Sequence, residues 1–118
     1  MHTPSNQSHL LGRLKQRPEF LRVAQEQRRW TATGLSVQIA PNARDTSRFG
    51  LTITKKIYKE AVKRNRIRRR LRALAYEVLS EFLPQGYDIV LIGRAETLER
   101  PYDDLKKDLL WCLKRLGV

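Results

Sequence analysis

Histidine, cysteine and long apolar runs are scarce in this chain of 118 residues, and each scarcity excludes a class of protein. The single cysteine, Cys112, cannot form an internal disulfide, so we expect it to be a small buried apolar residue. The two histidines, His2 and His9, fall in a polar N-terminal stretch where we expect solvated side chains. No apolar run approaches the roughly 20 residues of a membrane-spanning helix, and the N-terminus lacks a secretory signal. These absences predict a cytoplasmic protein with no membrane partner.

Candidate catalytic groups are equally few. Asp103, Asp104 and Asp108 cluster late in the chain, where we interpret them as helix-start and surface charges rather than a metal pair. No glycine-rich phosphate loop follows a predicted strand. We therefore expect binding chemistry, with no catalytic residue and no metal ligand in this chain.

Positive charge, by contrast, is abundant and concentrated. The net charge is +12, and ten of the 24 lysines and arginines lie in residues 55–72, where Glu60 is the only acid. The stretch KRNRIRRRLR, Lys63 to Arg72, holds seven cations in ten residues. Such concentration is typical of a protein that binds a polyanion, with nucleic acid first and an anionic membrane surface second.

Alternating and periodic apolar residues predict an α+β fold, a four-stranded sheet with helices packed on it. We expect residues 1–12 to form a mobile tail and residues 13–118 to form a single domain. The domain is expected to contain, in order, a helix from about Arg17 to Gln25, strands at 28–32, 35–39 and 48–54, a helix through 63–82, a strand at 87–93, a loop and a final helix that begins near Pro101.

The basic stretch carries a helical stripe of apolar residues at spacings of three and four: Ile67, Leu71, Leu74, Ala75, Val78, Leu79 and Phe82. At 100° per residue, Asn65, Arg66 and Arg69 fall on the side away from this stripe. Arg64 falls near the apolar side, at the helix start. Three further arginines flank the stripe: Arg68, Arg70 and Arg72. We expect the stripe to anchor the helix and the cations to remain outside.

A merely solvated charged face is the alternative for this helix. It is disfavoured because Arg66, Arg69 and Arg70 have no acidic partner three or four residues away, and their repulsion costs stability unless phosphates neutralise it. Guanidinium groups bind phosphate with two parallel hydrogen bonds and stack on bases, which favours structured RNA. A DNA-binding module is disfavoured because no helix suited to a helix-turn-helix precedes the basic one.

Three segments together resemble the bacterial ribonuclease P protein component: RLKQRPEFLRV, RFGLTITKK and AVKRNRIRRRLR. The Arg-Asn-Arg signature of that family matches Arg64, Asn65 and Arg66 at the start of the basic helix. The R-x-G-L/F-x-V/I-x-K-K strand matches Arg48 to Lys56, and the family's N-terminal helix contains a phenylalanine, here Phe20. The resemblance extends over residues 13–116, in order and with sensible spacing.

The resemblance implies the protein subunit of a ribonucleoprotein endonuclease that removes the 5′ leader from precursor tRNA. Catalysis then belongs to an RNA subunit that uses Mg²⁺, and no protein partner is evident. The implied contacts to the catalytic RNA are Arg64, Asn65, Arg66, Arg68, Arg69 and Arg72, with Lys55 and Lys56 nearby. The implied cleft for the single-stranded leader lies between the first helix and the sheet and is lined by Phe20, Ser36 and Gln38. A left-handed crossover into the central strand is also implied, against the usual right-handed rule.

The chain departs from the family pattern in two places. Tyr58–Lys59–Glu60 replaces a shorter glycine-containing turn between the lysine pair and Ala-Val, and Ala24 and Gln38 stand where some members have aromatic residues. Leader stacking would then depend mainly on Phe20. The residues leave one other interpretation open, a non-catalytic protein that binds structured RNA or associates with the ribosome.

Overall fold

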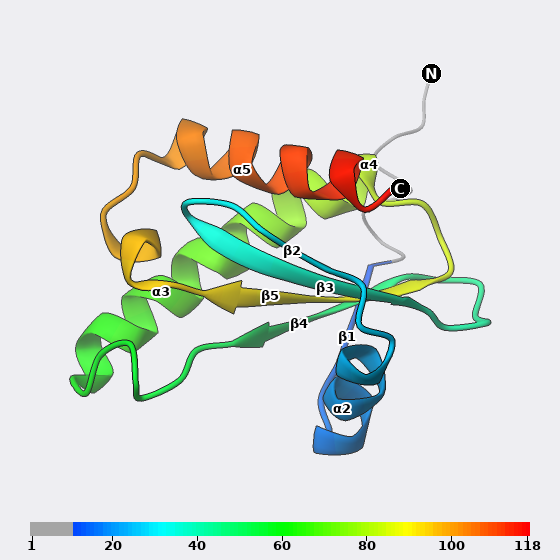
Figure 1. Ribbon diagram of the computed structural model, residues 1–118, viewed down its shortest axis with the longest axis horizontal. Helices are drawn as coiled ribbons and strands as arrows, with labels where there is room; N and C mark the ends of the chain where they lie inside the picture. Colours follow the sequence, from blue (N-terminus) through cyan, green and yellow to red (C-terminus); the bar gives the residue numbers. More distant parts are fainter. Residues whose placement is uncertain (1–10) are drawn as a thin grey trace.

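The computed structural model describes residues 11–118, and its elements follow the chain in the predicted order with one added strand. The strands are β1 (Gly12–Arg13), β2 (Arg29–Thr31), β3 (Leu35–Pro41), β4 (Arg48–Thr52) and β5 (Tyr87–Gly93). The helices are α2 (Arg17–Gln25), α3 (Ala61–Leu74), the π-helical turn η1 (Ala75–Leu79), α4 (Ser80–Phe82), the 3₁₀ turn η2 (Ala95–Leu98) and α5 (Tyr102–Arg115). Figure 1 shows α3 and α5 on one face of the sheet and α2 on the other. No helix in this part of the chain is both long and apolar enough to cross a membrane.

The sheet has five strands in the order β1-β4-β5-β3-β2, so the predicted four-stranded sheet is wrong by one edge strand. β1 pairs in parallel with β4, where Gly12 lies opposite Arg48, and the Gly12 amide donates to the Ser47 carbonyl at 2.8 Å. Periodicity missed β1 because a strand of two residues has no alternating pattern. Of the predicted tail, residues 1–12, Gly12 thus belongs to the sheet, and residues 1–10 lie outside the described residues.

The centre of the sheet agrees with the prediction. β4 and β5 run parallel with α3 between them in the chain, and β5 pairs on its other side with antiparallel β3. A strand buried between two neighbours is what the continuous apolar run YDIVLIG predicts. The turn from β2 to β3 contains Gly34, where a Cβ would lie 2.5 Å from the Leu105 side chain and 2.6 Å from Asp108. Glycine at this turn therefore lets α5 approach the sheet closely.

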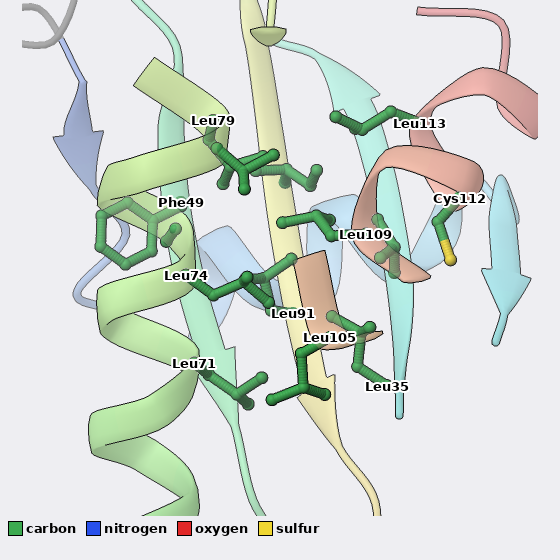
Figure 2. Close-up of a cluster of buried hydrophobic side chains, with 14 of the residues drawn as sticks. Leu35, Phe49, Leu71, Leu74, Leu79, Leu91, Leu105, Leu109, Cys112 and Leu113 are labelled. Atoms are coloured by element: carbon green, nitrogen blue, oxygen red, sulfur yellow. The ribbon is translucent and has the colours of Figure 1, made fainter. Parts of the chain in front are cut away.

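The main core fills the space between the sheet and the layer of α3 and α5 (Figure 2). It includes Leu35, Val37 and Ile39 of β3, the apolar side of the predicted alternation. Cys112 lies among these side chains with no exposed surface, and burial raises the pKa of its thiol to about 11. The expected role of Cys112 as a small apolar residue is confirmed.

The apolar stripe on the long helix is confirmed from Ile67 to Leu79 and is wrong at Phe82. Phe82 is 52% exposed, whereas Leu83 is 6% exposed. The cause is η1, because hydrogen bonds in a π-helical turn span five residues instead of four and fit about one extra residue into the turn. This extra residue rotates the following side chains backward, so that Phe82 points out and Leu83 points in. A count at 100° per residue assumes a single helix type and misses this change.

α2 packs on the opposite face of the sheet over a smaller core, formed by Leu14, Val23, Ala40 and Val90 with Phe20 and Ile92 packed against it. The helix begins at Arg17 as predicted. The Glu19 carboxylate accepts the backbone amides of Lys15 at 2.8 Å and Gln16 at 2.9 Å, which satisfies donors that a helix start leaves free. Because this core is small, the sheet beside α2 remains open.

The connection from β5 to α5 is more ordered than predicted. The expected loop contains η2, and α5 starts after Pro101 with Asp103 and Asp104 in its first turn. The interpretation as helix-start charges is confirmed for these two acids. It is wrong for Asp108, whose Oδ2 pairs with Arg100 Nε at 2.6 Å and accepts the Gly34 amide at 3.0 Å. Nearly two turns into the helix, Asp108 faces the β2–β3 turn instead of solvent.

Candidate nucleic-acid interface

α3 has a buried side and a cationic side. Ile67 and Leu71 have no exposed surface, whereas Asn65, Arg66 and Arg69 are exposed. This is the division that the helical wheel predicted. Glu60, the one acid of residues 55–72, pairs with Lys63 at 3.6 Å, so the charges of Arg66 and Arg69 face solvent.

Arg64 lies at the helix start near the apolar side, as predicted, and its guanidinium binds the protein's own backbone. Its Nη1 donates to the carbonyl oxygens of Tyr58 at 2.9 Å and Lys59 at 2.5 Å. The Lys63 ammonium lies 4.9 Å from the centre of the Tyr58 ring, a cation–π contact. The segment Tyr58–Lys59–Glu60, where the chain departs from the family pattern, is thus fixed to the first turn of the basic helix.

Arg70 also turns toward the protein. Its Nη1 donates to the carbonyl oxygens of Thr97 at 3.1 Å and Leu98 at 2.7 Å, and its Nη2 donates to that of Arg100. The guanidinium thereby satisfies carbonyls at the end of η2. Burial, and then the nearby charge of Arg66, lower the pKa of Arg70. Arg70 is absent from the predicted RNA contacts, and its position agrees with that.

The other predicted contacts lie around this exposed face. Arg68 is half-buried and donates to Asn65 Oδ1 at 3.0 Å. Arg72 is also half-buried, and its Nε has no hydrogen-bond partner within the described residues. Lys55 and Lys56 are exposed in the turn that follows β4. Except for Arg64, the predicted residues therefore present polar or cationic groups around α3.

A groove of about 500 Å³ lies between α2, the sheet and α3. It is lined by Arg17, Phe20, Leu21 and Ala24 of α2, by Gln38, Leu51, Thr52, Ile53 and Val90 of the sheet region, and by Arg68 of α3. Phe20 lies directly over β4, because a Cβ on Gly50 would be 2.5 Å from its ring. Glycine at position 50 thus permits the ring to lie against the strand. A groove with an aromatic ring and cations has the composition of single-strand binding sites.

The predicted cleft residues divide between two hollows. Phe20 and Gln38 line the groove, whereas Ser36 lies in a neighbouring hollow with Ile92 and Arg94. Ser36 is 2% exposed, and its Oγ lies 2.9 Å from Thr31 Oγ1. The prediction that Ser36 and Gln38 share the face away from the main core is correct. Of the groove residues in α2 and β4, Phe20 was predicted, whereas Arg17, Leu21, Leu51 and Thr52 were missed, since no spacing in the sequence brings these elements together.

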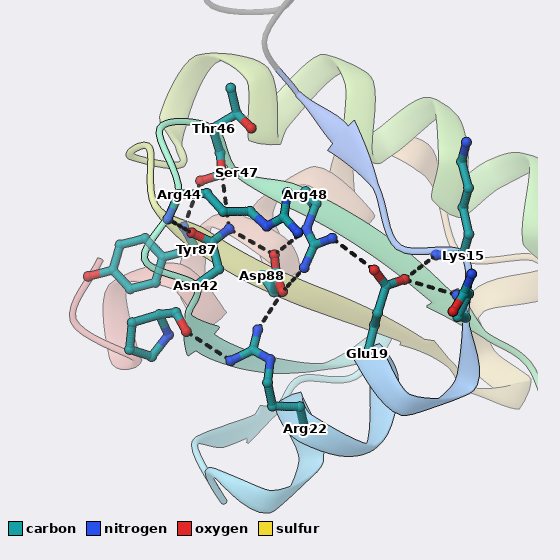
Figure 3. Close-up of polar contacts among 12 residues, drawn as sticks. Lys15, Glu19, Arg22, Asn42, Arg44, Thr46, Ser47, Arg48, Tyr87 and Asp88 are labelled. Atoms are coloured by element: carbon teal, nitrogen blue, oxygen red, sulfur yellow. Dashed lines mark hydrogen bonds and ion pairs between the residues drawn. The ribbon is translucent and has the colours of Figure 1, made fainter.

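A buried carboxylate anchors α2 beside the groove, as Figure 3 shows. Asp88 has no exposed surface and accepts two hydrogen bonds from Arg48, from Nε at 2.9 Å and from Nη2 at 2.6 Å. Arg22 of α2 reaches the same carboxylate at 2.5 Å, and Asn42 Nδ2 donates to it at 2.8 Å. Arg48 also pairs with Glu19 at 2.8 Å. One network therefore ties α2 to β4 and β5.

Both acids of this network are held in the ionised form. Burial alone would raise the pKa of Asp88, but the hydrogen bonds from its partners outweigh burial and lower the pKa. The pKa of Glu19 is lowered chiefly by the backbone amides of Gln16 and Lys15. This network was not predicted from the sequence, where its signal is an acid inside the apolar run YDIVLIG.

The described part of the chain is arranged for binding. Across residues 11–118, no three His, Cys, Asp or Glu side chains gather in a way that could hold a metal ion. The buried Asp88 and the partly buried Asp108 are both bound by arginines. His2 and His9 lie outside the described residues.

The family model and the similar sequences all belong to one protein family. The family model described as Ribonuclease P matches residues 11–117. The ribonuclease P protein component of Paramagnetospirillum magneticum is 49% identical over 113 residues, which cover 92% of this chain and 84% of the relative. That of Gluconacetobacter diazotrophicus is 44% identical over 107 residues, which cover 90% of this chain and 91% of the relative.

Comparison with solved structures leads to the same family. The ribonuclease P protein from Thermotoga maritima matches with a TM-score of 0.74 at 31% identity, over 87% of this chain and 96% of that protein. The protein from Staphylococcus aureus, at 24% identity, shares the fold with a TM-score of 0.73 over 90% and 95% of the two chains. From these matches and its basic helix, the chain belongs to the ribonuclease P protein family.

Proposed function

We propose that this chain is the protein subunit of a bacterial ribonuclease P and binds two RNAs at adjoining surfaces. The catalytic RNA lies along α3, and the 5′ leader of precursor tRNA lies in the groove beside α2. The observation that carries the proposal is Arg68, which belongs to the basic helix and also lines the groove. An RNA bound to α3 and a strand in the groove would therefore lie next to each other.

On α3, the exposed Asn65, Arg66 and Arg69 contact the catalytic RNA, with Arg68 and Arg72 at the margins. Their guanidinium groups bind phosphate oxygens in pairs of parallel hydrogen bonds. The crossover from β4 through α3 to β5, which brings this helix beside the groove, is left-handed in this proposal, as the family resemblance implies.

Arg64 has a different part in the proposal. By binding the carbonyls of Tyr58 and Lys59, it fixes the segment between β4 and α3. The same segment presents Lys55 and Lys56 to the RNA. Arg64 thus acts on RNA binding mainly by positioning two other cations.

In the groove, a base of the leader stacks on Phe20. The ring is held against the strand at Gly50, so stacking requires little loss of side-chain freedom. The Gln38 amide, in the same groove, can donate to and accept from a base edge. Ala24 provides no second ring, so Phe20 carries the stacking. Ser36 is held by Thr31 outside this groove and supports its wall.

Mg²⁺ belongs on the RNA subunit in this proposal. Mg²⁺ prefers carboxylate and phosphate oxygens, and the carboxylates of Asp88 and Asp108 are already bound by arginines. When bound to the RNA, the ion supplies the hydrolytic chemistry. The residues of this chain bind and orient the two RNAs.

Phe20→Ala in the assembled holoenzyme tests the groove. Loss of one base–aromatic stack costs about 1–3 kcal/mol, so affinity for precursor tRNA should fall about 5- to 150-fold. Affinity for mature tRNA, which has no leader, should stay unchanged. Leu21→Ala, which removes an exposed aliphatic side chain from the same groove, is the matched control and should change little.

Circular dichroism and a thermal melt show whether the variant is folded. An equal loss of affinity for both RNAs, or a protein that no longer folds, would mean that Phe20 is only a core residue.

A further inference from the structure

The two tryptophans of the chain meet at the edge of the sheet opposite β4. Trp30 lies on the edge strand β2 and Trp111 on α5, with ring centres 5.6 Å apart and ring planes at 68°. Trp30 is partly buried, whereas Trp111 is 48% exposed. An edge-to-face pair of this kind fixes the outer ring in place. A rigid aromatic face is therefore presented to solvent.

Arg115 completes this surface. Its guanidinium carbon lies 4.6 Å from the centre of the Trp30 ring and 5.9 Å from that of Trp111. Lys107 and Lys114 are exposed on the same stripe of α5, at helical spacing from Trp111. Cations in the last turn also favour the helix dipole, but that role requires no tryptophan beside them.

A hollow of about 400 Å³ adjoins the exposed ring, between Trp111 and the β2–β3 turn. Arg94 lines it and is held by its Nη1, which donates to the Ala32 carbonyl at 2.6 Å. Asp108 also lines it, but its carboxylate is neutralised by Arg100. Arg94 in turn pairs with Glu96 at 3.9 Å, so the hollow has one aromatic wall and its charged groups are paired.

We propose that this tryptophan surface, formed by Trp30, Trp111, Arg115 and the adjoining hollow, binds an unpaired nucleotide of single-stranded RNA. The base stacks on Trp111, and Arg115 binds the phosphate. This inference goes beyond the proposed function, since the surface shares no residue with α3 or the groove. It gives the molecule a third RNA-binding surface, at the β2 edge of its sheet.

Charge complementarity favours RNA over a protein partner. An acidic protein segment would neutralise Arg115 but would offer Trp111 a flat group only where it contains an aromatic or arginine side chain. A single-stranded nucleic acid offers a negative charge and a flat base at every nucleotide, and base–aromatic stacking tolerates any sequence.

Intrinsic fluorescence of the complete chain tests the proposal, because both tryptophans lie at the surface in question. Titration with a short oligoadenylate should quench the fluorescence to saturation. A base-paired RNA of the same length, whose bases are stacked inside the duplex, should quench far less. Neither the catalytic RNA nor tRNA is needed, so this result is independent of the proposed function.

Four variants show which residues are responsible for the quenching. Trp30→Phe should keep most of the quenching, whereas Trp111→Phe should lose most of it. Arg115→Ala should raise the oligoadenylate concentration at half-maximal quenching, the midpoint of the titration. The slope of log affinity against log salt should become shallower by about 0.7. Arg44→Ala removes one exposed cation from the loop between β3 and β4 instead and should leave the midpoint near that of the unaltered protein.

Three outcomes would overturn the proposal: no saturable quenching, an equal shift of the midpoint by Arg44→Ala and Arg115→Ala, or quenching that survives in Trp111→Phe as fully as in Trp30→Phe. Quenching by oligoglutamate as strong as by oligoadenylate would also overturn it and would indicate an acidic protein partner.

Discussion

At the scale of single residues, neighbouring arginines of one helix have different roles. Arg66 and Arg69 face solvent, whereas Arg70 binds backbone carbonyls of η2, 27 to 30 residues later in the chain. A helical wheel gives Arg68, Arg70 and Arg72 similar flanking positions, so it cannot distinguish an arginine that meets a distant turn from one that does not. Only the tertiary structure shows which arginines of α3 face solvent and which bind the protein's own backbone.

Replacing both Arg66 and Arg69 with alanine should leave the fold intact and weaken RNA binding. Both side chains are exposed, and alanine is the best helix former. Affinity for the catalytic RNA should fall, and the plot of log affinity against log salt should become shallower by about one unit per lost phosphate contact. Arg44→Ala, an exposed cation in the loop between β3 and β4, is the control and should change neither quantity.

Ile67→Asp on the same helix should instead disrupt the fold. It buries a charge in the core and should cost more than about 4 kcal/mol, enough to unfold the domain. Unchanged affinity and salt slope in the double arginine variant would show that the cationic face of α3 is merely solvated.

At the scale of elements, α2 is held to the sheet by a polar network as well as by its small core. Arg22 and Glu19 of α2 meet Arg48 of β4 and Asp88 of β5 in one set of ion pairs. Because α2 forms one wall of the groove, this network also sets the groove's width.

Asp88→Asn should loosen α2 and lower the free energy of unfolding by about 1.5–3 kcal/mol, the range for a lost charge-assisted hydrogen bond. The pKa of Asp88 is lower in the folded protein than the unfolded value of about 4. The carboxylate therefore stabilises the fold above that pH, and this stability is lost as the pH falls through the folded pKa. Urea unfolding at several pH values should show a smaller acid loss in Asp88→Asn than in the unaltered protein.

Asp45→Asn, in an exposed loop, is the matched control and should stay within about 0.5 kcal/mol at neutral pH. Equal acid sensitivity in Asp88→Asn and the unaltered protein would contradict this role of the network.

The elements also show where sequence reasoning succeeds and where it stops. The alternation around Val37 and the stripe through Leu71 each predicted the buried face correctly, because each pattern is local. The strand β1, the π-helical turn η1 and the pairing of Arg48 with Asp88 were missed. β1 is too short for a pattern, η1 changes the helical period, and the pair joins residues 40 positions apart. For the groove, the resemblance supplied Phe20, but only the fold brought it onto Gly50.

At the scale of the whole molecule, cations are placed on several faces of one small domain. The basic face of α3 and the groove adjoin at Arg68, whereas the tryptophan surface lies at the other edge of the sheet. Asp88 and Asp108 are bound by arginines and contribute to stability instead of offsetting these surfaces. The net charge of +12 is thus largely available to RNA.

Reconstitution with a bacterial catalytic RNA and a precursor tRNA tests the proposed role in leader removal most directly. Incubated alone with precursor tRNA, the purified chain should release no leader, since its described residues form no metal site and no acid–base pair suited to hydrolysis. Together with the RNA subunit at low Mg²⁺, it should produce cleavage at the mature 5′ end that neither component produces alone. Cleavage at that site by the chain without RNA, surviving further purification, would contradict the assignment of catalysis to the RNA. Failure of the chain to stimulate the RNA subunit would contradict its role as the protein subunit.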